Sequence, residues 1–211
     1  MSKGARIKNS SHERLPWRLR EIAPDFELID AWRLPATGTY EDFADLPRVF
    51  AGLGVARGRG WSPTSILFKV RWWLGQRLGW DERTSDLPIP RSTETSLRER
   101  LPADLPPATL DPDGDSPFDP VYQTEVEWAG EISNSTVHAV LHLGWVQRKD
   151  GLWRGQMGVY VKHRGWLGKL YMPLIAPFRH YIVYPALMRS VGGAWKARHD
   201  SVSLAPERSA T

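Results

Sequence analysis

Three stretches between residues 121 and 162 alternate apolar and polar side chains, and two short polar segments separate them. A period of two is typical of β-strands that bury one face, and small polar residues cluster at the turns between such strands. Residues 133–136 and 149–151 have this turn composition. We therefore predict an antiparallel meander of three strands, which requires a second layer over its apolar face.

The turn at residues 149–151 determines how the second and third strands pair. A three-residue loop with Gly151 at positive φ places Leu143 opposite Met157, and it also places Leu141 opposite Val159. Every pair on this face is then apolar. A two-residue turn would mix polar and apolar faces, which a half-buried sheet disfavours. The sequence therefore predicts the three-residue loop.

Counting residues outward from the first turn, at residues 133–136, in the same way pairs Glu131 with His138 and Glu127 with His142. A carboxylate that orients an imidazole supports acid–base catalysis, so Glu131, His138 and His142 are the candidate catalytic residues. The alternative is a structural ion pair on the outer face of the sheet. Histidines four residues apart on a strand lie about 13 Å apart, too far to share one ion, so we predict no metal site.

Residues 25–34 form a further predicted strand, which ends at Pro35. The residues that share its apolar face are Phe26, Leu28, Trp32 and Leu34. Asp30 lies among them, and an inward carboxylate needs an ionic partner, water or a bound ligand. Asp30 is therefore a candidate polar anchor for a ligand, and a structural ion pair is the alternative.

Shorter elements are predicted between this strand and the meander. We expect a helix over residues 39–53, with a break at Pro47, and a second helix over residues 62–78. Residues 93–100 are expected to form a short helix or strand. The proline-rich residues 101–120 are expected to form a long loop.

A long helical stretch is predicted over residues 167–197. Pro177 is expected to start its second segment and Pro185 to kink it. The apolar face of this helix is predicted to include Tyr181, and its outer face Arg179. We expect the apolar face to pack against the meander, which supplies the missing layer.

The order of these elements predicts an α+β helix-grip fold, in which a curved antiparallel sheet surrounds a long C-terminal helix. We expect a single domain over residues 25–197, between flexible tails at residues 1–24 and 198–211. Such an interface between sheet and helix usually encloses a cavity. The residues predicted to line this cavity and bind a ligand are Asp30, Trp32, Trp128, Leu141, Leu143, Trp145 and Met157. A solid aromatic core is the alternative for the tryptophans.

Composition excludes several classes of protein. The 211 residues are 41% hydrophobic and carry a net charge of +4, which a disordered chain would not combine. The chain has no cysteine, so it has no disulfide, zinc finger or thiol nucleophile. No apolar run approaches the roughly 18 residues of a transmembrane helix, and no secretory signal is visible. These features predict a cytoplasmic protein.

Charge is unevenly distributed along the chain. Residues 81–144 carry 4 basic and 13 acidic residues, whereas residues 145–198 carry 10 basic residues and a single acidic one. The basic residues are spaced among apolar ones, and the acidic segment would repel phosphates, so we predict no nucleic-acid partner. The aromatic and basic C-terminal stretch would suit a membrane surface, but the sheet requires this helix, so we expect no membrane contact.

Four segments of the chain resemble the bacterial family described as domain of unknown function 2867 (DUF2867). They are EWAGEISN (127–134), TVHAVLHLGWV (136–146), RGQM (154–157) and YMPLIAPFRH (171–180). The resemblance covers residues 25–197. The family is similar to the START and Bet v 1-like superfamily, which implies the helix-grip fold. It implies no catalytic residue.

Some relatives in this family carry the domain behind a short-chain-dehydrogenase-like NAD(P)-binding domain. The GxGxxG motif of such a domain is absent from this chain, so we predict no cofactor. Three functions then stay open. The first, which we predict, is a domain that binds a small apolar or aromatic ligand. The second is a cofactor-free cyclase, dehydratase or isomerase that uses the same cavity, and the third is an accessory subunit for a separate reductase or a membrane surface.

Overall fold

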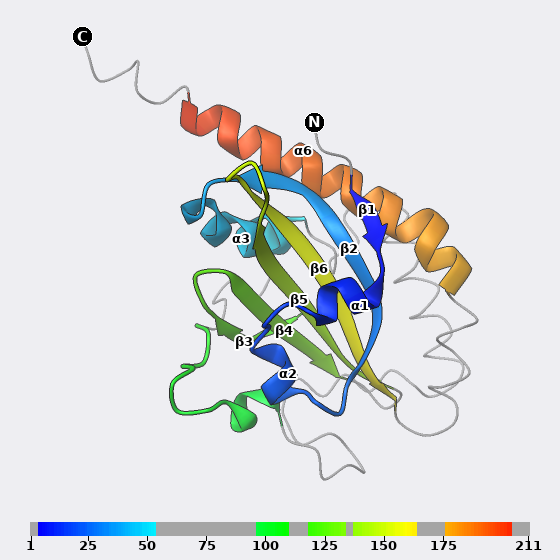
Figure 1. Cartoon of the computed structure of the whole chain (residues 1–211). Helices are drawn as coiled ribbons and strands as arrows, with labels where there is room; N and C mark the ends of the chain where they lie inside the picture. Colours follow the sequence, from blue (N-terminus) through cyan, green and yellow to red (C-terminus); the bar gives the residue numbers. More distant parts are fainter. Residues whose placement is uncertain (1–3, 54–95, 110–117, 134–136, 164–175, 204–211) are drawn as a thin grey trace.

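Six antiparallel strands form one curved, open sheet in the computed structural model (Figure 1). The structure describes residues 4–53, 96–109, 118–133, 137–163 and 176–203. The strands are β1 (Ala5–Ile7), β2 (Glu27–Gly38), β3 (Asp119–Gln123), β4 (Glu127–Ser133), β5 (Val137–Gln147) and β6 (Trp153–His163). Their order across the sheet is β1-β2-β6-β5-β4-β3. The predicted meander is thus extended by β2 and β1 at one edge and by β3 at the other.

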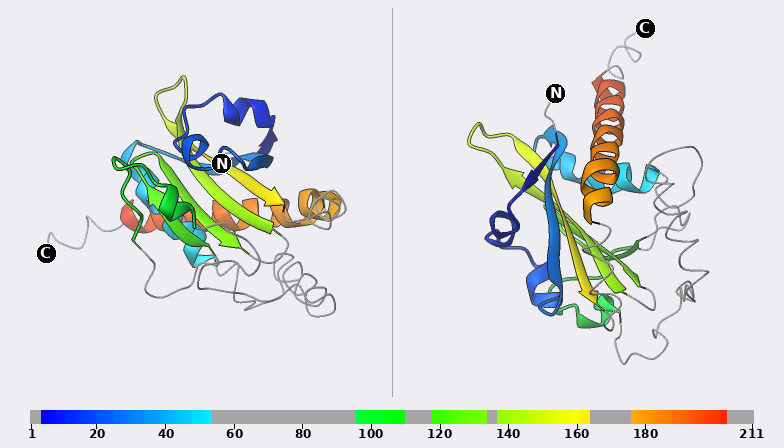
Figure 2. Two further views of the ribbon diagram at one scale, coloured as in Figure 1. Left: turned by 90° about the horizontal axis from the view of Figure 1, so that it is seen from below. Right: turned by 90° about the vertical axis from the view of Figure 1, so that its right-hand side faces the viewer.

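Helices cover both faces of the sheet. They are α1 (Asn9–Glu13), α2 (Leu19–Ile22), the 3-10 helix η1 (Glu41–Ala44), α3 (Asp45–Gly52), the 3-10 helix η2 (Leu97–Arg100), the π-helical turn η3 (Arg179–Val183) and α6 (Tyr184–Ser203). The long helix α6 lies on the same side of the sheet as α3, whereas α1 and α2 lie on the opposite side (Figure 2). The helix predicted over residues 62–78 lies outside the described residues.

The predicted pairing of β5 with β6 is confirmed. Leu143 lies opposite Met157, and Leu141 lies opposite Val159. At the turn, Gly151 has a φ of 81°, and the Arg148 amide donates to the Leu152 carbonyl at 2.7 Å. The three-residue loop therefore places the apolar faces of both strands on one side, as the alternation requires.

The predicted pairing of β4 with β5 is wrong by two residues. His138 lies opposite Ser133, and His142 lies opposite Ala129. A shift of two keeps every side chain on its predicted face, because side chains alternate with that period. Glu131 and Glu127 consequently still reach these histidines, although along the diagonal of the ladder.

Strand β2 continues through Pro35, where the sequence predicted its end. Its pairing with β6 is irregular between Arg33 and Thr37, and Pro35 lies within this irregularity. Proline is tolerated there because the interrupted ladder does not need its missing N–H. The strand can therefore extend to Gly38.

A second irregularity in β2, between Leu28 and Asp30, divides its apolar residues between the two faces. Phe26 and Leu28 belong to the core under α2, whereas Trp32 belongs to the core under α6. The prediction that all of them share a face with Asp30 is wrong, because one extra residue in a strand reverses the alternation. Asp30 and Trp32 both face the C-terminal helix.

The core between the sheet and α6 contains the side chains predicted to point inward. Its members from the strands include Trp32, Leu34, Trp128, Leu141, Leu143, Trp145 and Met157, and its members from α6 are Tyr184, Met188, Val191 and Trp195. All of these are less than 9% exposed. The face assignment of the meander is thus confirmed.

The N-terminal residues are not the flexible tail that the sequence predicted. Strand β1 pairs with β2, and the segment that follows it buries His12, Trp17, Leu19 and Ile22 against the sheet. Each element here has five residues or fewer. Such lengths are too short to produce a periodic pattern in the sequence.

The start of the C-terminal helix also differs from its predicted orientation. Tyr181 is 82% exposed, although it was expected on the apolar face. Arg179 was expected on the outer face, but only 11% of its side chain is exposed. The π-helical turn η3 precedes Pro185 and turns these residues relative to α6, because a π turn holds more residues than an α turn. Pro185 itself lies in the first turn of α6, directly after this π-helical turn.

Two shorter predictions are confirmed with adjusted bounds. Residues 39–53 contain η1 and α3, and the junction between them at Asp45 lies two residues before Pro47. Proline fits there because the first turn of a helix does not use its N–H. Within residues 93–100 the described part contains η2.

Candidate functional site

The Asp30 carboxylate lies where β1, β2 and the C-terminal helix meet, and it is fully buried. His180 Nε2 lies 2.6 Å from Oδ1. Arg179 Nε lies 2.8 Å from Oδ2, and the Tyr184 hydroxyl donates to Oδ2 at 3.0 Å. Arg6 is more distant, with Nη2 3.5 Å from Oδ1. The structure thus gives Asp30 the arginine partner that the sequence left as one alternative.

An open pocket of about 440 Å³ lies beside this cluster. Its lining includes Arg6, Glu27, Asp30, His163, Ala176 and His180. The volume falls in the range of about 300–1,000 Å³ that is typical of small-molecule sites. The pocket lies at the end of the interface between the sheet and the C-terminal helix, not within it.

Among the predicted ligand-binding residues, Asp30 is the one found in the described lining of this pocket. The other six pack into the core between the sheet and α6. The indole N–H of Trp145 donates to the Thr39 carbonyl at 2.8 Å. Trp32 Nε1, in contrast, is buried without a hydrogen-bond partner, and its ring lies 4.9 Å from that of Tyr184. Among the tryptophans predicted to bind a ligand, Trp32 therefore has an indole N–H that is free to donate a hydrogen bond.

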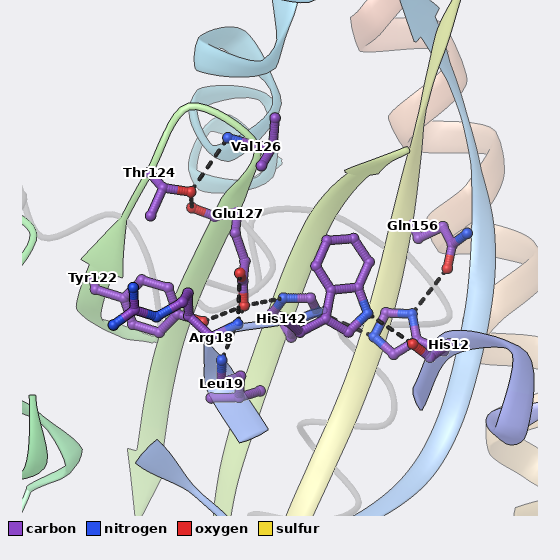
Figure 3. A network of polar contacts seen from close by, with 10 residues as sticks. His12, Arg18, Leu19, Tyr122, Thr124, Val126, Glu127, His142 and Gln156 are labelled. Atoms are coloured by element: carbon purple, nitrogen blue, oxygen red, sulfur yellow. Dashed lines mark hydrogen bonds and ion pairs between the residues drawn. The ribbon is translucent and has the colours of Figure 1, made fainter. Parts of the chain in front are cut away.

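The candidate acid–base residues lie on the opposite face of the sheet. Figure 3 shows His142 there, together with its partner Glu127. His142 Nε2 lies 3.0 Å from Glu127 Oε1, which also accepts a hydrogen bond from the Tyr122 hydroxyl. On its other side, His142 Nδ1 lies 3.1 Å from Nε2 of His12. His12 Nδ1 completes the chain at 2.9 Å from Gln156 Oε1. This chain of hydrogen bonds runs across four strands to helix α1.

The partners of each ring nitrogen restrict the protons in this chain. Ionised Glu127 only accepts, so His142 Nε2 donates to it. The side-chain oxygen of Gln156 likewise only accepts, so His12 Nδ1 donates to it. Burial together with neighbouring His142 lowers the pKa of His12 to about 3, which favours the neutral ring.

Glu127 also holds the covering segment in place. Its oxygens accept hydrogen bonds from the backbone amides of Arg18 at 2.9 Å and Leu19 at 3.1 Å, where α2 begins. Burial alone would raise the pKa of Glu127, but the hydrogen bonds from His142 and Tyr122 lower it below its usual value. Glu127 therefore stays ionised and caps α2 from the sheet.

Glu131 does the same for η2. Its Oε1 accepts a hydrogen bond from the Ser96 hydroxyl. Its Oε2 accepts one from the Leu97 amide at 3.1 Å, and His138 Nε2 lies 2.7 Å from the same oxygen. Burial would raise the pKa of Glu131, and the hydrogen bonds from His138 and Ser96 lower it. The two glutamates thus attach two separate segments to one face of the sheet.

This arrangement favours a structural role for the candidate catalytic residues. The exposed fractions are 5% for Glu131, 1% for His138 and 0% for His142. Every carboxylate oxygen in the two pairs has a partner within the protein. A general base must reach its substrate directly or through one water, and these groups do not face the pocket beside Asp30.

Within the described residues, no group of three or more His, Asp or Glu side chains is arranged to hold a metal ion. None of the helices in this part of the chain has both the length and the apolar character that a membrane-spanning segment requires.

The fold and these two clusters define an α+β protein with a curved antiparallel sheet between an N-terminal cover and a C-terminal helix. The chain belongs to the family described as Protein of unknown function (DUF2867), whose model matches residues 22–186. Comparison with curated proteins and with solved structures found no match in either group.

Sequence reasoning missed most partners of Asp30. Arg6 lies in the segment interpreted as a tail, and Arg179 was placed on the outer face of its helix. His180 and Tyr184 follow at spacings that reach Asp30 only because η3 is a π turn. A signal did exist, since a buried aspartate requires cations and the next basic pair on an apolar helix is Arg179-His180.

Proposed function

We propose that this chain is a small-molecule binding domain of the helix-grip type, similar to the START and Bet v 1-like superfamily. The curved sheet and the long C-terminal helix on its concave side support this architecture. The ligand is a small molecule with an apolar or aromatic part, and its polar end is held at the pocket beside Asp30. The observation that carries the proposal is this pocket, which has a fully buried carboxylate in its lining.

Two further features support binding at this end of the interface. The pocket combines charged groups with apolar surface from Leu28, Ile29 and Ala176, a composition typical of small-molecule sites. Trp32 Nε1 adds a buried donor without a partner behind the Asp30 cluster. A bound molecule or an ordered water would satisfy such a donor.

Binding is favoured over catalysis because of how the acid–base groups are used. The carboxylate oxygens of Glu127 and Glu131 already accept hydrogen bonds from the segments that cover the sheet. The pocket itself has histidines, but Asp30 is fully engaged by groups of the protein. A site of fixed, mutually paired charges is suited to recognition of a polar group more than to proton transfer.

The test is to purify the chain from its own host and to analyse it by native mass spectrometry. A bound small molecule is expected, and Ala176→Trp, which fills the pocket, should abolish its retention. Ala197→Trp is the matched control, because Ala197 lies on the exposed side of α6. Equal retention by both variants, or ligand-free wild-type protein that binds nothing from a host extract, would refute the proposal.

A further inference from the structure

We infer that the pocket beside Asp30 recognises a carboxylate on its ligand, and that Arg6 and His163 bind this group. The inference deepens the proposed function and rests on it, because it assigns the chemical class of the ligand at the same pocket. It follows from which charged groups in the pocket are already engaged and which are not.

Asp30 does not compete strongly for a further cation. Its two oxygens already receive His180 Nε2 at 2.6 Å and the Tyr184 hydroxyl at 3.0 Å, and Arg179 Nε lies 2.8 Å from Oδ2. Its buried charge is therefore compensated from the C-terminal helix. Arg6, which comes from β1 at the other side, approaches no closer than 3.5 Å.

Arg6 consequently has capacity for a ligand. Its side chain is 53% exposed and lines the pocket. A guanidinium has five N–H donors in a planar fork, and one long contact to Asp30 leaves most of them available. The fork matches both oxygens of a carboxylate, which makes an anionic group the natural partner.

His163, at the end of β6, supplies a second polar atom without a partner. Its Nδ1 is buried without a hydrogen-bond partner, while its Nε2 lies 3.8 Å from Glu27 Oε2. A buried nitrogen without a partner is unfavourable, and an acceptor oxygen of a ligand would satisfy it. His163 and Arg6 both line the pocket, so one carboxylate can be bound between them.

The remaining lining decides between a carboxylate with an apolar body and a bare inorganic anion. Leu28, Ile29 and Ala176 give the pocket an apolar side. Glu27 is the one acidic group of the described lining besides Asp30, and its side chain is 72% exposed. It would repel a doubly charged phosphate and compete with a ligand for His163. A monocarboxylate with an apolar or aromatic body fits both features.

The experiment compares phenylacetate, phenylacetamide and inorganic phosphate by isothermal titration calorimetry on the full chain, freed of any bound molecule. The acid and the amide have the same shape and differ in charge. Charge-assisted hydrogen bonds should make phenylacetate bind at least about tenfold more tightly than the amide. Inorganic phosphate should bind more weakly than phenylacetate.

Two pocket variants should change this preference in opposite directions. Arg6→Gln should reduce phenylacetate binding to the level of the amide. Glu27→Gln removes the competing carboxylate and should strengthen phenylacetate binding by a few fold, an effect that damage to the fold would not produce. Arg14→Gln, an exposed arginine directly after α1 and outside the pocket lining, is the control and should leave both affinities unchanged.

Equal binding of acid and amide would overturn the carboxylate inference and leave the proposed function standing. Binding of phenylacetate that is unaffected by Arg6→Gln would also overturn it, and so would tighter binding of phosphate. If neither organic probe binds, the inference fails as well. The proposed function is then judged separately, by the retained molecule and the Ala176→Trp variant.

Discussion

The indole of Trp17 occupies the space above Gly144, where a Cβ atom would lie 2.4 Å from Cη2 of the ring. His12 has the same relationship to Gly158, with a Cβ position 2.7 Å from its Nε2. The two glycines face the N-terminal segment from neighbouring positions on β5 and β6. The sheet is thus recessed where this segment packs, although the family model begins only at residue 22.

Gly144→Ala should destabilise the protein by about 1–3 kcal/mol, because the added methyl group displaces the buried indole of Trp17. Urea unfolding followed by circular dichroism measures this change. Gly193→Ala is the matched control: nothing lies within 4 Å of a Cβ there, and alanine in a helix should stabilise by about 0.5–1 kcal/mol. Equal stabilities of Gly144→Ala and wild type would contradict the close packing of Trp17.

Acid should lower the free energy of unfolding, because His12 is buried as a neutral ring. Burial and His142 lower the pKa of His12 to about 3, whereas its value in the unfolded chain is close to 6.5. Between these two pKa values the unfolded chain binds more protons than the folded protein. The contribution of neutral His12 to the free energy of unfolding is therefore fully present above the unfolded pKa, and it is lost as the pH falls. The loss from this single group approaches about 1.4 kcal/mol per pH unit.

His12→Gln separates this contribution from the other titrating groups. Glutamine keeps a polar side chain and does not titrate, so the variant should lose less stability than wild type from about pH 7 to about pH 5. The glutamates with lowered pKa values, Glu127 and Glu131, lose their contribution only at more acidic pH. Parallel pH profiles of the variant and wild type would show that His12 is accessible to protons in the folded protein.

The three strands of the meander and their apolar face were predictable from residues 121–162, because alternation determines the faces and a glycine turn leaves few consistent registers for β5 and β6. Leu141, Leu143 and Trp145 were correctly placed against the C-terminal helix for this reason. The register of Glu131 with His138 was not predictable, since a shift of two residues preserves the same faces. Only the length of the turn distinguishes the two, and composition does not determine that length.

The candidate site was less predictable, and the reason is local backbone geometry. One irregularity in β2 separates Leu28 from Asp30, and one π turn directs Arg179 toward the sheet. Each changes the face of a side chain through a single residue, which leaves no periodic trace in the sequence. The importance of Asp30 itself was predictable, because a carboxylate among apolar residues needs partners.

Glu127→Gln and Glu131→Gln should release different parts of the cover. Each substitution removes the charge that holds a helix start and a histidine, so each should cost about 3–5 kcal/mol. Amide hydrogen exchange should accelerate over residues 9–23 in Glu127→Gln and over residues 96–101 in Glu131→Gln. Glu125→Gln, at an exposed position in the bend that precedes β4, is the control. Identical exchange patterns in both variants would contradict separate anchors.

Trp145→Ala should cost about 3–5 kcal/mol, because the indole is 2% exposed and packs against Phe43 and Trp195. Trp145→Phe keeps most of this volume and loses the hydrogen bond to the Thr39 carbonyl, so its cost should be smaller. Thermal unfolding of both variants measures the difference. A stable Trp145→Ala variant would show that this residue lines free space and does not fill the core.

Asp30→Asn tests whether the buried carboxylate stabilises the fold, the ligand site or both. The amide keeps the shape but leaves Arg179 opposite a neutral group, and the Arg179 side chain is only 11% exposed. Breaking a buried ion pair from one side should cost about 3–5 kcal/mol. Asp104→Asn, which removes an exposed partner of Arg18, is the control and should leave the unfolding midpoint unchanged.

The double variant Asp30→Asn with Arg179→Gln removes both charges of the pair. It should recover part of the lost stability, since no uncompensated charge then stays buried. Loss of ligand retention in this double variant, with stability recovered, would assign the ion pair to the binding site, whereas full retention would make it a purely structural contact between β2 and the C-terminal helix.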